Sequence, residues 1–425
     1  MQILVPLTVL SCILYLAFQN RSKSFPLFVI AVLFAVVAFS FQPLQTDDLA
    51  REYEKLRDIA DQGWKYFSVY TQNIKGGNYT NSFGGLYFAQ IYYYIFAQFE
   101  VLNWFPAITI FIDYFLEFRL LKKIMKKYEL SELDGFVLFL MIICFRETYN
   151  MMSGIRNYLA FTIFGYALYV DLVERKSKIR CFIVYVLTAL MHPSAWMIVA
   201  VRGLCYIPSR KIKNMAAIFV LFWGNLLNVV LRILADYSGL SFINALYVKL
   251  YSYTNENSVY SSLATADSRY MIYMLSNLFI VILVVYIFID WAKLRAVLGN
   301  VIIAPFKRLN LKEGTIYVRP MPKEVFSSNE SLVAYENVFY FSIICLSLMI
   351  GALPHRIIFS RIGIMVRIIS IIPTAILFSY CNQEEMHSRK KTLVFIVLLA
   401  CLWKFVIMMW FCNRSMHFDL FGIYY

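Results

Sequence analysis

Charged residues are scarce in this sequence, and those present are not spread evenly. Only 16% of the 425 residues are Asp, Glu, Lys or Arg, whereas 60% are hydrophobic. The apolar residues fall in blocks instead of alternating with polar ones, which excludes a chain of ordinary soluble domains. The pattern predicts an all-α polytopic membrane protein, with residues 1-425 forming a single integral membrane domain of about 10-12 transmembrane or re-entrant helices around an outward-open cavity.

The sequence also lacks the motifs of nucleotide-driven and metal-dependent enzymes. It contains no Walker motif, no GxGxxG, no HExxH and no GxSxG, which argues against ATP-driven transport and soluble-type hydrolysis. It has eight cysteines and four histidines, but no CxxC pair and no histidine at metal-ligand spacing. We therefore interpret the cysteines as small core residues and expect neither a metal nor a cofactor.

Positive charge is in excess, with a formal net charge of +14. Most of it sits in short clusters between apolar blocks, at residues 122–127, 175–180, 210–213 and 389–391. By the positive-inside rule, these clusters and the long segment 291-335 face the cytoplasm, and the polar loops 42-85 and 235-269 are extracytoplasmic. Topology thus explains the charge, and we expect no nucleic-acid partner.

Two apolar stretches are too short for the spans that the topology would require of them. Residues 181–207 begin and end at basic clusters, yet they cannot make two full crossings. A proline within MHPSA disfavours helical geometry there, so we predict a broken hairpin with His192 at its outward tip. Residues 86–99 are predicted to form a second re-entrant or interfacial helix.

Several arginines lie near the predicted outer side, where the positive-inside rule disfavours them. Arg156 stands near the start of the apolar run MMSGIRNYLAFTIFGYALY, where it either snorkels to headgroups or binds an anion. Arg356 and Arg367 share a helix face within about 20°, while Arg361 points away. A bound polyanion explains these arginines better than topology does. His192 either carries chemistry or is a buried histidine satisfied by a backbone carbonyl.

Acidic and aromatic residues supply the remaining candidates. The first loop opens FQPLQTDDLAREYEKL, where Asp47 or Asp48 either caps a solvated helix or serves as a general base, with Tyr53 close by. Glu147 follows Arg146 and is expected to form a local ion pair or to join the site. Tyr87 leads a tyrosine-rich segment that suits either sugar stacking or an interfacial aromatic belt.

Four short motifs together resemble the EpsG family, which belongs with the Wzy-type polymerases of bacterial capsule, exopolysaccharide and O-antigen. They are the acidic-Tyr stretch TDDLAREYE, the Arg and Ala of GIRNYLA, the bend MHPSA and the late Arg-rich HRIIFSRIG. The likeness covers most of the chain but says nothing about 291-335.

The resemblance implies a multi-pass protein of the bacterial plasma membrane that transfers a growing glycan from undecaprenyl diphosphate onto a lipid-linked repeat unit. It implies no cofactor, and it implies a flippase and a chain-length regulator as partners beside the lipid bilayer. Arginine forks suit the diphosphate leaving group, and a carboxylate or histidine suits the attacking hydroxyl. The candidate site residues are, for catalysis, His192, Asp47 and Asp48, and for substrate binding, Arg156, Arg356, Arg361, Glu147, Tyr53 and Tyr87.

Three other activities fit the same residues. A flippase for lipid-linked oligosaccharides shares the basic cavity and the aromatic residues. A membrane O-acyltransferase uses a buried histidine to activate a sugar hydroxyl. A ligase that moves the finished glycan to another acceptor uses the same chemistry as the polymerase.

Overall fold

The computed structural model of the protein describes residues 3–18, 24–45, 47–68, 86–223, 230, 233, 236, 237, 329–353, 355–383, 387–415 and 417–418. The predicted loop 235-269 lies outside the described residues except for Asp236 and Tyr237, and 291-335 lies outside them up to residue 328. Its last residues are helical, because α18 begins at Asn329.

The expectation of an all-α fold is confirmed for the described residues, which form fifteen helices and one pair of two-residue strands. The first helices are α1 (Leu4–Ala17), α2 (Ser24–Phe39), α3 (Asp48–Gln62), α5 (Tyr87–Ala97), α6 (Trp104–Lys127), α7 (Glu132–Phe145) and α8 (Thr148–Ser153). They are followed by α9 (Ile155–Leu172), α10 (Lys178–Met191), α11 (Ala195–Cys205), α12 (Arg210–Val220), α18 (Asn329–Gly351), α19 (Arg356–Ile369), α20 (Ile371–Gln383) and α21 (His387–Ser415).

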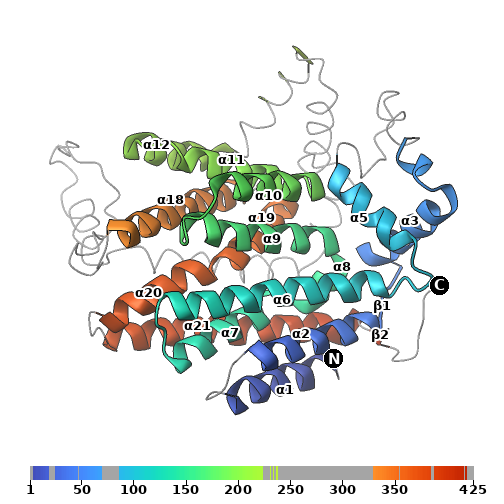
Figure 1. Ribbon diagram of the computed structural model, residues 1–425, viewed down its shortest axis with the longest axis horizontal. Coiled ribbons are helices and arrows are strands. Elements are labelled where there is room, and N and C mark those ends of the chain that lie inside the picture. Colours follow the sequence, from blue (N-terminus) through green and yellow to red (C-terminus); the bar gives the residue numbers. More distant parts are fainter. Residues whose placement is uncertain are drawn as a thin grey trace.

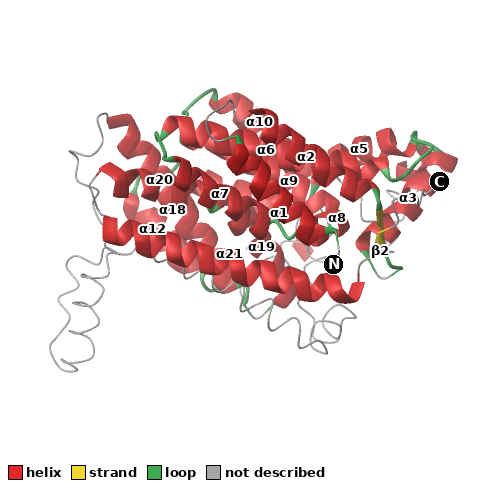
Figure 2. Ribbon diagram, turned by 90° about the horizontal axis from the view of Figure 1, so that it is seen from below, coloured by secondary structure: helices red, strands yellow, loops and turns green. Residues whose placement is uncertain are grey.

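The helices lie side by side in one elongated bundle (Figure 1). Helix α6 packs against α2 on one side and α9 on the other, and α10 follows α9. Helix α21 packs against α7 and α20, so the end of the chain lies beside its first half. The strands β1 (Phe41–Gln42) and β2 (His417–Phe418) pair antiparallel and join these halves at one end, near α3 and α8 (Figure 2).

Local sequence signals account for where the helices begin and end. Helix α7 starts at a capping box, in which Ser131 and Asp134 each accept a hydrogen bond from the other's backbone. The break predicted at MHPSA is confirmed, because α10 ends at Met191 and α11 begins at Ala195. Helix α5 is about 16 Å long at 1.5 Å per residue, too short to cross a bilayer alone, as its sequence predicted.

By length and composition, one stretch of the described residues could cross a membrane. It is Ile358–Asn382, formed by α19 and α20, and it is buried inside the bundle. Four shorter apolar helices accompany it: Leu4–Ala17, Ser24–Phe39, Ala195–Cys205 and Glu336–Gly351. The predicted number of crossings therefore stays a prediction.

The outer faces of several helices carry large apolar side chains. On α2 the exposed set recurs every three or four residues, at Phe25, Phe28, Val32 and Val36. Similar stripes are exposed on α1 (Val9, Leu10, Ile13, Leu16), α10 (Ile179, Phe182, Ile183, Leu187) and α21 (Phe395, Leu398, Leu399, Leu402, Val406). Contiguous exposed apolar surface of this kind is uncommon on water-soluble monomers and marks a surface that something apolar covers.

Candidate functional site

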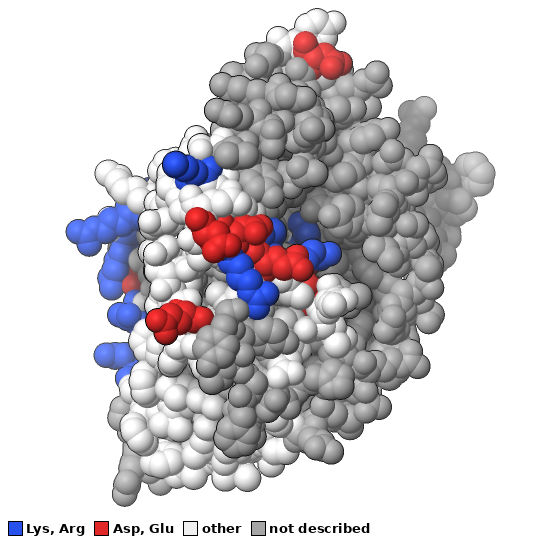
Figure 3. Space-filling model, turned by 90° about the vertical axis from the view of Figure 1, so that its right-hand side faces the viewer, with Lys and Arg blue, Asp and Glu red and all other residues white. Residues whose placement is uncertain are grey.

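The candidate site lies at the end of the bundle where α3 and α5 pack together. Helix α3 is amphipathic, and its apolar face buries Leu49, Leu56 and Ile59. Figure 3 looks at this end, where acidic and basic side chains of the described residues lie next to one another. Most charged side chains of α3 are therefore exposed at this end, whereas that of Glu52 is buried.

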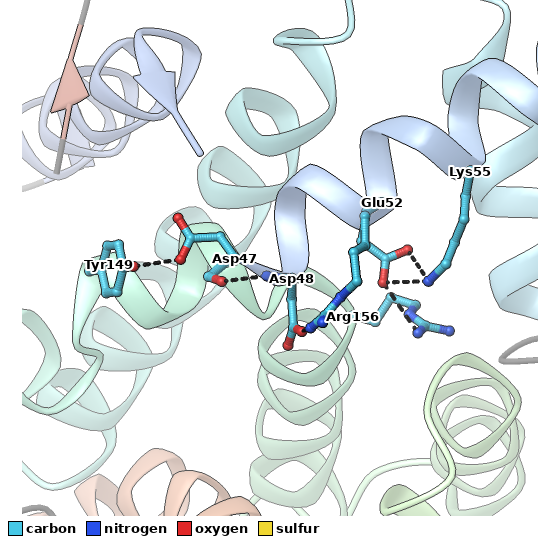
Figure 4. Close-up of polar contacts among 8 residues, drawn as sticks. Asp47, Asp48, Glu52, Lys55, Tyr149 and Arg156 are labelled. Atoms are coloured by element: carbon cyan, nitrogen blue, oxygen red, sulfur yellow. Dashed lines mark hydrogen bonds and ion pairs between the residues drawn. The ribbon is translucent and has the colours of Figure 1, made fainter. Parts of the chain in front are cut away.

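Asp47 occupies the N-cap position of α3, as predicted, but its side chain does not cap the helix. One carboxylate oxygen accepts a hydrogen bond from the backbone N–H of Leu44 at 2.9 Å. The other accepts one from the hydroxyl of Tyr149 on α8, at 2.7 Å (Figure 4). Asp47 therefore ties the start of α3 to α8.

The structure pairs Arg156 with a carboxylate that comes from α3. The guanidinium Nη2 lies 3.4 Å from Oε1 of Glu52, which is 104 residues away in the chain (Figure 4). Both oxygens of Glu52 lie 3.0 Å from the ammonium of Lys55. We call Glu52, Lys55 and Arg156 the end triad.

An aromatic ring completes the surroundings of Arg156. Its guanidinium carbon lies 5.5 Å from the ring centre of Tyr93, a cation–π contact from α5. Arg156 is thus held between α3, α5 and its own helix α9, with 14% of its side chain exposed. The side chain of Arg156 therefore does not extend into solvent.

Burial and charge act in opposite directions on Glu52. Burial favours the neutral acid, but the positive charges of Arg156 and Lys55 outweigh it and hold the pKa of Glu52 below its usual value. Burial lowers the pKa of Lys55, an effect that Glu52 opposes and Arg156 reinforces. Glu52 is therefore ionised at neutral pH and available as an anionic partner.

The other predicted residues of this end differ in accessibility. Asp48 is exposed and pairs with Arg51 one turn along α3, while its backbone N–H donates to the hydroxyl of Ser153 at 3.3 Å (Figure 4). Tyr53 is buried within the apolar face of α3, and its contact with substrate stays a prediction. Tyr87 begins α5 and is 63% exposed, and its stacking on a sugar stays a prediction.

His192 lies at the break between α10 and α11 and is buried. Its Nδ1 accepts a hydrogen bond from the backbone N–H of Ser194 at 3.3 Å, and its ring meets Phe161 edge-on at 6.1 Å. Phe161 lies about 7.5 Å beyond Arg156 along α9. His192 thus contacts the same helix as Arg156, but below the surface that carries Asp48.

The late arginines lie on α19, and their predicted clamp stays a prediction. Arg356 begins α19, but its side chain lies outside the described part of the structure, and Arg361 is half-buried. Arg367 is buried, and its Nη2 lies 3.2 Å from Oε2 of Glu147, so in this structure its charge is paired within the protein.

Of the two alternatives for Glu147, the local ion pair with Arg146 is not the one formed, and its predicted part in substrate binding stays a prediction. Arg146 instead pairs with Glu117 of α6. The carboxylate of Glu147 binds Arg367 and, at 2.7 Å, the ammonium of Lys404. We call Glu147, Arg367 and Lys404 the buried triad. Glu147 also has a φ of 51°, a left-handed conformation that side chains other than glycine rarely adopt.

Sequence reasoning placed Glu52 in the acidic stretch but did not include it, Lys55 or Tyr93 among the site residues. A usable signal existed for Glu52, because it lies three residues after Leu49 and four before Leu56, on the buried face of an amphipathic helix. Among the described residues, no group of three or more His, Cys, Asp and Glu is placed to hold a metal ion.

No protein-family model, curated protein or solved structure matches the chain. The four short motifs therefore remain the sole basis for the resemblance to the EpsG family.

Proposed function

We propose that the protein is a multi-pass membrane glycosyltransferase that polymerises a lipid-linked glycan at the outer face of the bacterial plasma membrane. The observation that carries the proposal is Arg156, a mostly buried arginine at the end of an apolar bundle that contacts a carboxylate and an aromatic ring. A diphosphate leaving group needs a cation placed in this way.

The exposed apolar stripes support the membrane part of the proposal. They occur on α1, α2, α10 and α21, helices that lie on different sides of the bundle. A single partner protein would cover one such face, whereas the hydrocarbon of a bilayer would cover all of them. The end triad would then stand near one membrane surface, because it lies at the end of the bundle.

The geometry of the end triad leaves Arg156 able to exchange its partner. Charge-assisted hydrogen bonds between N–H and carboxylate are usually about 2.7 to 2.9 Å long. The contact of Arg156 with Glu52 is longer, at 3.4 Å, and Glu52 is shared with Lys55. A diphosphate can therefore compete for the guanidinium while Glu52 keeps it oriented.

The transfer would proceed by attack of an acceptor hydroxyl oxygen on the anomeric carbon of the donor sugar. The bond from that carbon to the diphosphate oxygen breaks, and the diphosphate leaves with the electron pair toward Arg156. The hydroxyl proton passes to a base. Among the three predicted bases, Asp48 is exposed. Asp47 and His192 are buried and accept hydrogen bonds from other groups of the protein. We therefore assign this role to Asp48, and Asp48→Asn should abolish polymerisation.

The buried triad favours a second candidate, a flippase for lipid-linked oligosaccharides. Ionisable groups inside a membrane bundle are typical of transport pathways. Deleting the gene separates the candidates by the glycan left on the lipid carrier. Single repeats exposed outside indicate a polymerase, missing outward-facing repeats indicate a flippase, and full-length glycan without acyl groups indicates an acyltransferase.

The main experiment replaces Arg156 by lysine and by alanine. Lysine keeps the charge but lacks the planar donor pair, so losing charged hydrogen bonds of roughly 1.5 to 3 kcal/mol should slow transfer about ten- to a hundredfold. Polymer length is measured from purified lipid-linked repeat units at matched protein levels. Arg57→Lys, at an exposed position of α3, is the matched control. Full-length polymer from both Arg156 variants would remove Arg156 from the site.

Membrane topology is tested with single cysteines in a cysteine-free variant. Position 48 should react with a membrane-impermeant maleimide from outside, whereas position 176 should not. Both side chains are well exposed, so a missing reaction reports the side of the membrane and not burial. Position 192 is unsuitable because it is buried. Reaction of both positions from the same side contradicts the proposed orientation.

A further inference from the structure

A second charged region lies at the far end of α6 from the candidate site. A cavity of about 370 Å³ opens there between the start of α2 and the last turns of α6. This volume falls within the usual range for pockets that bind small ligands. Its centre along α6, near Lys122, is about 27 Å from Trp104 at the other end of the helix.

The lining of the cavity is divided between cationic and apolar side chains. Among the described residues that line it, none is acidic and four are basic: Arg119, Lys122, Lys123 and Lys126. One of these charges is balanced from outside the cavity, because Lys123 lies 2.8 Å from a carboxylate oxygen of Glu174. Lys122 donates a hydrogen bond to the hydroxyl of Ser24, which is itself neutral. The cavity therefore keeps an excess of positive charge.

The apolar part of the lining comes from both helices, at Leu27, Phe28, Phe115 and Phe118. Phe28 and Phe115 are also exposed on the outer surface of the bundle. On α2, Phe28 belongs to the outward apolar stripe that runs on to Val36. The cavity thus leads from a cationic end onto an apolar outer surface.

Lysines at a helix C-terminus can be explained by the helix dipole or by topology alone. Neither explanation requires a cavity with aromatic walls. An occupant that matches both parts has an anionic head and a hydrocarbon tail.

We propose that this cavity binds an anionic phospholipid, with its phosphate at Lys122, Lys126 and Arg119 and an acyl chain along Phe28 and Phe115. The inference rests on the membrane location given under the proposed function, but it does not depend on the glycosyl transfer. It assigns the cavity to the membrane surface opposite the end triad, in the leaflet that the basic clusters are predicted to face.

The test titrates fluorescently labelled phosphatidylglycerol into the full-length protein in a neutral detergent and follows fluorescence anisotropy. Labelled phosphatidylcholine is the uncharged control lipid. The variant Lys122→Gln/Lys126→Gln should bind phosphatidylglycerol about tenfold or more weakly than the wild type, since each basic residue near an anionic headgroup contributes to binding. Lys127→Gln, on the same helix but outside the cavity, is the matched control and should bind normally. Both lysines of the double variant are exposed, so its melting temperature should equal that of the wild type.

Three outcomes overturn the inference: equal binding of the two lipids by the wild type, an equal loss in Lys127→Gln, and displacement of the lipid by millimolar inorganic phosphate. Arg156→Lys separates the inference from the proposed function. If Arg156→Lys binds lipid normally but no longer polymerises, both the inference and the proposed function are supported. If Arg156→Lys polymerises normally while the double lysine variant loses lipid binding, only the inference is supported.

Discussion

The end triad and the buried triad are built from the same three side chains, a glutamate, an arginine and a lysine. Their surroundings differ. In the end triad the side chains of Arg156 and Glu52 are 14% and 10% exposed, and the lysine comes from the same helix as the glutamate. In the buried triad the arginine and glutamate are 1% and 4% exposed, and the lysine is 257 residues away from the glutamate.

This difference assigns the two triads different roles. Charges removed from water cost several kcal/mol each unless they are compensated, so the buried triad holds only while all its members are present. It joins the start of α8 to α19 and α21. The side chains of the end triad are less deeply buried, so we expect its members to change partners at a smaller cost than those of the buried triad, as a binding site requires.

The strongest test of the comparison is Glu147→Gln. Without the carboxylate, Arg367 and Lys404 remain buried as two uncompensated positive charges. Breaking a buried ion pair on one side costs about 3 to 5 kcal/mol, and the free energy of unfolding should fall by that amount. Thermal unfolding in detergent, followed by circular dichroism, measures the loss. If Glu147→Gln had the same melting temperature as the wild type, the buried triad would not stabilise the fold.

The two triads also show how far the sequence could be read. Pro193 and the short apolar run 86–99 predicted a helix break and a short helix, because both are local properties of the chain. The partners of Arg156 and Glu147 were missed, because Glu52 lies 104 residues and Arg367 lies 220 residues away. Local patterns show that a charge within an apolar segment needs a partner, but only the packing of the helices selects which one. The polymerase activity remains a prediction.

The next largest effect is expected from Glu52→Gln. Its loss removes the anion that orients Arg156, so polymerisation should slow about tenfold, while the free energy of unfolding falls by only about 1 to 2 kcal/mol. The variant Glu52→Gln/Arg156→Lys should be no slower than Arg156→Lys alone, because residues that act through one contact are not additive. If the fold loss in rate of the double variant equalled the product of the two single losses, Glu52 and Arg156 would act separately.

A smaller effect follows from pH. The pKa of Glu52 is below its usual value in the folded protein, so its ionised contacts stabilise the fold above the unfolded pKa of about 4.3 and are lost as the pH falls through the folded pKa. The difference in melting temperature between wild type and Glu52→Gln should therefore be constant from pH 8 to about pH 5 and should shrink below it. A difference that grows on acidification contradicts the lowered pKa.

The smallest effect is expected from a third arginine–carboxylate contact, which lies at the surface and serves as the reference for the stability contributions of the other two. Arg51 pairs with Asp48 on the surface of α3, and more than half of each side chain is exposed. Exposed pairs of this kind contribute less than about 1 kcal/mol and are screened by salt. Arg51→Gln should therefore have the same melting temperature as the wild type at both low and high salt. Arg51→Gln could instead lose as much stability as Glu52→Gln. Side-chain exposure would then not distinguish the two contacts, and burial would not explain the difference between the buried triad and the end triad.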